Sequence, residues 1–158
     1  MLGYMLTTLT EEGGIDWSIR SAGTHVAEGS AMSSRTRDAL RRIPELGEHA
    51  YGAHRGHQLT RDDIEWADAI LASEALHVAF VRLHYPDATA KAVLFGQYLR
   101  DAPLDQPFAA QIAYVASLVP ESRYDVEDPA GEDQSAYDRC AATLWEMAQV
   151  LATLAETP

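Results

Sequence analysis

The 158-residue sequence predicts an α/β fold, in which a parallel sheet lies between layers of helices. Two short apolar runs of strand length, residues 68–72 and 90–95, alternate along the chain with stretches of helical periodicity. Hydrophobic residues make up 47% of the chain and charged residues 23%, which is ordinary for a globular protein. A chain of this length is expected to form a single domain over residues 1–158.

The first third of the chain predicts a helix, a strand and a second helix. Residues 1–12 should be helical, because apolar side chains recur three and four residues apart and Gly13-Gly14 is typical of a helix C-terminus. Residues 15–21 alternate apolar and polar side chains, which predicts a short half-buried strand. Ser33 or Ser34 should begin a helix that ends near Arg42.

The middle third follows the same alternation after a loop over residues 49–58. Thr60 is expected to cap a short helix that precedes the strand at 68–72. Ser73 should cap the next helix, which ends at Tyr85-Pro86. The core-facing side chains predicted for that helix are Leu76, Phe80 and Leu83.

The last third begins with the strand at 90–95 and continues with two helices, over residues 107–119 and 132–154. The side chains predicted to face the core from the final helix are Tyr137, Leu144, Met147, Val150, Leu151 and Leu154.

Charge and cysteine content exclude several classes of protein. Because the chain carries 24 acidic and 12 basic residues, for a formal net charge of −12, nucleic acid and anionic membranes are poor partners. No segment approaches the ~18 apolar residues that span a bilayer. The single cysteine, Cys140, cannot form an internal disulfide or a zinc site built on several thiolates. We therefore expect a cytoplasmic protein.

Two groups of polar residues could carry chemistry. A carboxylic acid in the loop Asp125–Pro129 could serve as a general acid, although an Asp-Pro turn before a helix explains the same residues and is favoured by the local sequence. His54, His57 and His77 lack the spacing of known metal motifs, so we expect no metal and no cofactor.

Four segments occur in a recognisable order: Trp17–Thr24, His54–Thr60, Ala67–Leu71 with His77 after it, and Asp128-Pro129 followed by Tyr137. With them, nearly the whole chain resembles the low-molecular-weight protein tyrosine phosphatase family. The resemblance implies a three-layer α/β sandwich, in which a four-stranded parallel sheet has its first strand in the middle.

The resemblance also implies roles for five residues. Asp128 matches the general acid of the family, which protonates the leaving phenolate and later activates water. Ser21 and His54 match groups that hydrogen-bond the phosphate-binding loop. His57 stands where an arginine is usual, and Ala130 stands where an aromatic pocket wall is common, so we expect an altered aryl pocket.

The catalytic loop of the family, Cys-x-x-x-x-x-Arg-Ser, follows the first strand and is absent from this sequence. Residues 1–12 match the helix after that loop, so we expect a domain that is incomplete at its N-terminus and lacks its central strand. Cys140 cannot replace the nucleophile, because it belongs to the opposite end of the chain. Phosphorylated proteins or small aryl phosphates would be substrates only if the loop were supplied, and the chain should be inactive as written.

Two other functions remain open at this stage. The chain could be a pseudophosphatase that binds a protein partner, or a second copy of itself, through an exposed sheet edge. It could also be an arsenate reductase, which shares the fold, but that chemistry needs several cysteines and is the least favoured of the three.

Overall fold

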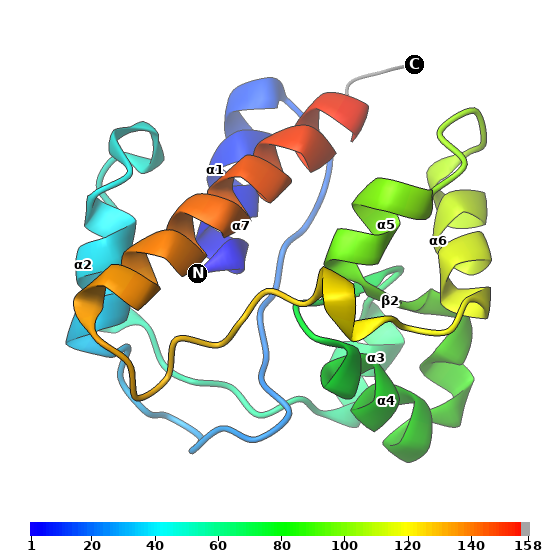
Figure 1. Cartoon of the computed structure of the whole chain (residues 1–158), viewed down its shortest axis with the longest axis horizontal. Helices are drawn as coiled ribbons and strands as arrows, with labels where there is room; N and C mark the ends of the chain where they lie inside the picture. The colour runs from blue at the N-terminus through cyan, green and yellow to red at the C-terminus, as the bar shows by residue number, and fades with distance from the viewer. Residues whose placement is uncertain (156–158) are drawn as a thin grey trace. The chain divides into compact units, whose positions relative to one another are not determined.

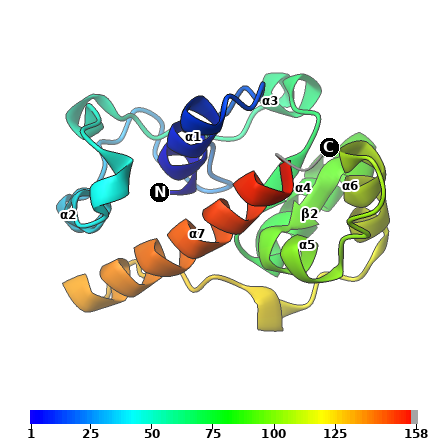
Figure 2. The same cartoon turned by 90° about the horizontal axis from the view of Figure 1, so that it is seen from above.

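The computed structural model describes residues 1–155 and consists of two compact units. The first unit contains residues 1–58 and 128–155, and the second unit contains residues 59–127. Figures 1 and 2 show the elements of each unit from two directions.

The first unit is built from three helices: α1 (Leu2–Gly13), α2 (Ser34–Arg41) and α7 (Gln134–Ala155). Single 3-10 turns, η1 (Pro44–Leu46) and η2 (Tyr51–Ala53), follow α2. The long helix α7 packs against both α1 and α2, as Figure 1 shows. Buried side chains from α1, α2 and α7 form the core of this unit, among them Met5, Leu40, Leu144 and Leu151.

Two predicted helix boundaries in this unit are confirmed. Gly14 follows α1 in the left-handed conformation, with φ 63°, and its backbone N–H donates to the carbonyl of Thr10. Ser33 caps α2, because its hydroxyl oxygen accepts a hydrogen bond of 3.0 Å from the backbone N–H of Thr36.

The strand predicted over residues 15–21 is wrong, because no regular strand forms there. The side chains nevertheless alternate as expected, with Ile15, Trp17 and Ile19 half-buried and the residues between them exposed. A strand also needs a neighbour to pair with its backbone, and within residues 1–155 this stretch joins no ladder. An isolated parallel bridge between Gly23 and Gln58 forms just after it.

The second unit holds a parallel two-stranded sheet surrounded by short helices. Strand β1 (Ile70–Ala72) pairs with β2 (Ala92–Leu94), with Leu71 opposite Val93. This arrangement confirms the α/β class and a parallel strand within each predicted run; β2 is fully buried as predicted, whereas Ile70 and Leu71 of β1 are half-buried. The remaining elements are α3 (Arg61–Trp66), α4 (Ala75–His84), η3 (Pro86–Lys91), α5 (Phe95–Asp101), α6 (Phe108–Ser117) and η4 (Ser122–Tyr124). Helix α5, which begins directly after β2, was missed by the sequence patterns.

The predicted core face of α4 is wrong. Val78 and Val81 are buried, whereas Leu76 is 59% exposed and Leu83 is 74% exposed; Phe80, the third predicted residue, is half-buried. Because α4 carries apolar residues on both sides, periodicity alone could not select the side that packs against the sheet. The same error affects Val150 of α7, which is exposed, although the predicted Tyr137, Leu144 and Leu151 are buried.

Helix α3 is stabilised at both ends by side chains. At its start, the predicted cap Thr60 forms a capping box with Asp63, whose carboxylate accepts the backbone N–H of Thr60 at 2.9 Å. At its end, the ammonium group of Lys91 donates to the carbonyl oxygens of Ile64 and Ala67, each at 2.7 Å. The only lysine of the chain therefore ties η3 to α3.

Replacing this lysine should destabilise the protein. K91M removes two charge-assisted hydrogen bonds to half-buried carbonyls, so the free energy of unfolding should fall by about 1.5–3 kcal/mol. Urea denaturation followed by circular dichroism measures this loss. R100M removes an exposed positive charge on α5 and should change the unfolding free energy by no more than about 0.5 kcal/mol. Equal losses in both variants would contradict the assigned role of Lys91.

Candidate functional site

The first turn of α1 is one side of the candidate site. No side chain caps this turn, so the amides at the start of the helix have no side-chain acceptor. Ser21 lies against Gly3, because a Cβ atom added to Gly3 would lie 3.2 Å from that of Ser21. The absence of a side chain at Gly3 therefore lets Ser21 approach the helix start.

His54 lies against the same turn of α1. Its Nδ1 atom is 3.4 Å from the hydroxyl oxygen of Tyr4, and the two ring centroids are 5.9 Å apart. The Tyr4 ring also contacts Tyr51 at 5.0 Å and His49 at 5.4 Å between centroids. His49 Nε2 in turn lies 2.9 Å from the hydroxyl of Thr8. We call Tyr4, His49, Tyr51 and His54 the Tyr4 cluster.

Burial shifts the pKa values of two members of the Tyr4 cluster. The pKa of His54 is lowered, first by desolvation and then by the positive charges of the α-amino group and Arg55. The pKa of Tyr51 is raised, mainly by desolvation and also by Tyr4. The hydroxyl of Tyr51 is buried and has no hydrogen-bond partner among residues 1–155. The environment of the cluster therefore favours a neutral His54.

His57 belongs to a second set of contacts in the first unit. Its Nδ1 atom lies 3.4 Å from a carboxylate oxygen of Glu28, and the other oxygen accepts the backbone N–H of Gln58 at 2.6 Å. The carbonyl of His57 accepts the N–H of Gly23 at 2.9 Å. These bonds join the loop that contains Glu28 to residues 57–58. Sequence reasoning missed Glu28, which has no motif around it.

Asp128 and Ala130 form an exposed turn. The carboxylate of Asp128 accepts the backbone N–H of Ala130 at 3.0 Å, which is the Asp-Pro turn that the local sequence favoured. Within residues 1–155, neither Asp128 nor Ser21 hydrogen-bonds to His54. The structure thus brings Ser21 and His54 to one helix turn and pairs Asp128 with Ala130. The role of Asp128 as general acid stays a prediction.

The neighbouring carboxylate of Asp125 has a structural task. It accepts the backbone N–H of Ala75 at 2.7 Å and so completes the N-terminus of α4. The predicted cap of that helix, Ser73, is wrong, because α4 begins after Glu74. The backbone carbonyl of Ser73 accepts the N–H of Val126 at 2.9 Å.

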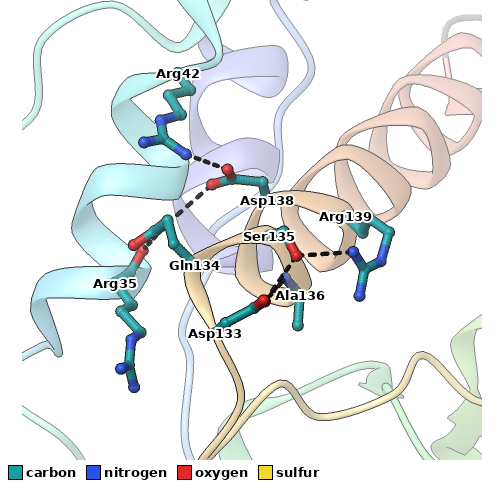
Figure 3. Close-up of polar contacts among 8 residues, drawn as sticks. All are labelled: Arg35, Arg42, Asp133, Gln134, Ser135, Ala136, Asp138 and Arg139. Carbon is teal, nitrogen blue, oxygen red and sulfur yellow. Dashed lines mark hydrogen bonds and ion pairs between the residues drawn. The ribbon is translucent and has the colours of Figure 1, made fainter.

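The chain after the Asp128 turn is anchored at the start of α7, as Figure 3 shows. Asp133 accepts the hydroxyl of Ser135 at 2.7 Å and the N–H of Ala136 at 3.1 Å, and these bonds lower its pKa. Gln134 donates to the carbonyl of Arg35 and to Asp138, which also pairs with Arg42. The start of α7 is therefore joined to α2.

Cys140 is half-buried within α7, away from either helix end. In residues 1–155, no group of three or more His, Cys, Asp or Glu side chains could hold a metal ion. No helix in that part of the chain is both long enough and apolar enough to span a membrane.

Comparisons with known proteins find phosphatases that are similar to this chain. No family model matches it. A protein-arginine-phosphatase of Geobacillus stearothermophilus is 32% identical over 96 residues, or 60% of this chain and 62% of that relative. The solved YwlE arginine phosphatase from the same organism superposes with a TM-score of 0.70 at 26% identity, over 96% of this chain and 82% of the other. The chain is thus similar in sequence and fold to low-molecular-weight phosphatases.

A further solved structure supports the fold of this family. The low-molecular-weight protein tyrosine phosphatase from T. tengcongensis superposes with a TM-score of 0.73 at 23% identity, over 95% of this chain and 86% of the other. The predicted fold is thereby confirmed. The match to the curated arginine phosphatase spans 62% of the length of that relative.

The lowered pKa of His54 predicts a pH-dependent stability. The folded state holds fewer protons on His54 than the unfolded state does. The contribution of His54 to the free energy of unfolding is therefore fully present above the unfolded pKa, about 6.5. It is lost as the pH falls through the lower pKa of the folded state. H54Q should therefore flatten the dependence of unfolding free energy on pH below about 6.5, as measured by urea titrations. H84Q, the same substitution at an exposed histidine, is the control. A wild-type slope in H54Q would contradict this assignment.

Proposed function

We propose that residues 1–158 carry the acid and the supporting residues of a low-molecular-weight phosphatase but not the groups that bind and attack phosphorus. The reaction of the family proceeds through attack of a cysteine thiolate on phosphorus, with backbone amides and an arginine around the phosphate oxygens. Neither the cysteine nor the arginine of that motif is present in these residues. The chain therefore does not hydrolyse phosphotyrosine by itself and acts as a pseudoenzyme in this form.

The position of Cys140, in the sequence and in α7, is the main support for this proposal. Six residues after it, where the motif requires arginine, the sequence has Glu146. Cys140 also lies inside a 22-residue helix, whose interior amides donate to carbonyls four residues earlier and cannot surround a phosphate group. A nearby negative charge would further oppose binding of an anion. Cys140 is thus a packing residue.

The start of α1 is where we place the phosphate when a catalytic loop is supplied. A 12-residue helix without a side-chain cap has positive potential at its first turn, which favours an anion, although the N–H of Tyr4 already donates to the carbonyl of Met1 at 3.1 Å. Ser21 and His54, which flank this turn, are in position to hydrogen-bond such a loop and fix its shape. Asp128, exposed on its turn, would supply the proton to the leaving group.

The substrate class follows from the family and its relatives. Phosphorylated proteins or small aryl phosphates fit the reaction of low-molecular-weight tyrosine phosphatases. A second candidate is phosphoarginine, which is favoured by the name of the relative that is 32% identical, a protein-arginine-phosphatase. Ala130 and His57 would border either substrate. A cytoplasmic location fits the reduced state expected for a chain with one cysteine.

A non-catalytic alternative rests on the sheet. Within residues 1–155, β1 pairs on one side with β2 and leaves its other edge without a strand. Such an edge can accept a strand from a protein partner or from a second copy of the chain. The chain would then be a pseudophosphatase that works by binding.

Activity measurements test the first proposal. Residues 1–158 should not release phosphate from p-nitrophenyl phosphate or from a phosphoarginine peptide above the rate in buffer, because no covalent intermediate can form. Turnover by this chain that disappears in C140S would contradict the proposal. Fusing a strand and a Cys-x-x-x-x-x-Arg-Ser loop before Met1 should create activity, and the preferred substrate then separates the two classes.

The same fusion tests the general acid. D128N should lower its kcat by about 10²–10⁴, because the leaving group is no longer protonated. D16N, which removes another exposed carboxylate, should leave kcat within about twofold of the parent. A similar kcat in D128N and the parent would remove Asp128 from the mechanism while leaving the missing nucleophile unaffected.

Light scattering tests the binding alternative. If the free edge of β1 recruits a second copy, the chain should have twice the monomer mass of 17.3 kDa, and proline at Leu71 should return it to a monomer by blocking edge pairing. Far-ultraviolet circular dichroism of L71P establishes that its helices are intact. A monomer at all concentrations would exclude self-association through this edge.

A further inference from the structure

The second unit contains a pocket that the proposed reaction does not use. It has a volume of about 580 Å³ and lies between α5, α6 and the segment that follows α6. The residues that line it are Gln97, Asp101, Tyr114, Leu118, Val119 and Glu121. None of the residues assigned to phosphate chemistry is among them.

Hydrogen bonds hold the walls of this pocket in place. Gln97, which is only 3% exposed, donates to the carbonyl of Val119 at 3.3 Å and accepts the backbone N–H of Glu121 at 3.2 Å. The hydroxyl of Tyr98 donates to the side chain of Gln111 at 2.6 Å and so links α5 to α6. The pocket is therefore built by the fold and needs no ligand to form.

The lining combines negative charge with apolar surface. Tyr114 is 50% exposed and offers an aromatic face, next to the side chains of Leu118 and Val119. Asp101 and Glu121 supply two carboxylates. Glu121 pairs with Arg123 at 3.0 Å, but both side chains are exposed, so this ion pair is weak and can be exchanged.

Asp101 is the unusual member of this group. It is half-buried, and no ion-pair partner is found for it in the part of the chain that the structure describes. It is also the last residue of α5, where the helix carbonyls already create negative potential. A carboxylate there is unfavourable for the helix unless a cation neutralises it.

We propose that this pocket binds an organic cation with an apolar stem, such as a guanidinium or ammonium group carried on hydrocarbon. The two carboxylates would pair with the charge, and the ring of Tyr114 would contact the stem or the cation. The net charge of −12 attracts cations to the surface and repels anions. This site is independent of the phosphate chemistry proposed for the first unit.

Calorimetric titration with benzamidinium, and with its neutral analogue benzamide, tests the proposal on the 158-residue chain. Benzamidinium should bind at least about fivefold more tightly than benzamide, since the two differ mainly in charge. D101N should weaken benzamidinium binding by about fivefold or more, and E121Q should weaken it in the same direction. D105N removes a carboxylate from the α5–α6 loop outside the pocket and should leave the Kd within about twofold. Raising the salt concentration should weaken binding.

Three results would overturn the proposal: no binding of benzamidinium, equal affinity for benzamide, or an affinity that D101N and E121Q leave unchanged. Circular dichroism of each variant shows whether it is folded. Y114L is a second test of the same pocket, because it removes the aromatic face. A peptide pair, acetyl-Leu-Arg-Leu-amide and its citrulline analogue, identifies the source of the cation. Tighter binding of the arginine peptide than of benzamidinium assigns the site to a protein side chain, and the reverse assigns it to a small molecule.

Discussion

The backbone groups of a strand need hydrogen-bonding partners on both sides where they are removed from water, and within residues 1–155 the partly buried strand β1 pairs on one side only, with β2. Each buried N–H or C=O group that stays unpaired costs about 1–3 kcal/mol, against a total stability of about 5–15 kcal/mol for a domain. Residues 15–21 also lack a strand to pair with among residues 1–155. Their side chains alternate as in a strand, but no ladder forms. The two units accordingly depend on their own helices and caps for stability.

The missing neighbour of β1 also separates the proposed supporting residues of a phosphatase site from the groups that would react with phosphorus. In the family, one segment both occupies the centre of the sheet and places the cysteine and arginine around phosphorus. Here Ser21 and His54 flank an uncapped helix start, and Asp128 lies on a turn that leads into α7. In the proposed reaction these residues would orient a loop and move a proton, but none of them would replace the nucleophile. The proposed loss of activity follows from that division.

Features decided by neighbours in the sequence were predictable, and features decided by tertiary packing were not. Gly14, Ser33 and Thr60 mark helix ends through local hydrogen bonds, so the sequence located them correctly. The strand at residues 15–21 and the buried side of α4 depend on which partner is present, and both predictions were wrong. In the site, motif order selected Ser21, His54 and Asp128. The contacts of Tyr4 and Glu28 span 50 and 29 residues, so no local pattern could indicate them.

Hydrogen–deuterium exchange of the β1 amides, resolved by NMR, tests the open edge most directly. In a parallel pair, successive amides point alternately toward and away from the neighbouring strand. The amides of residues 70–72 that face β2 should therefore be protected, and those that face the other way should exchange at rates close to those of an unfolded chain. Uniform protection across residues 70–72 would show that another strand occupies this edge and would contradict the account.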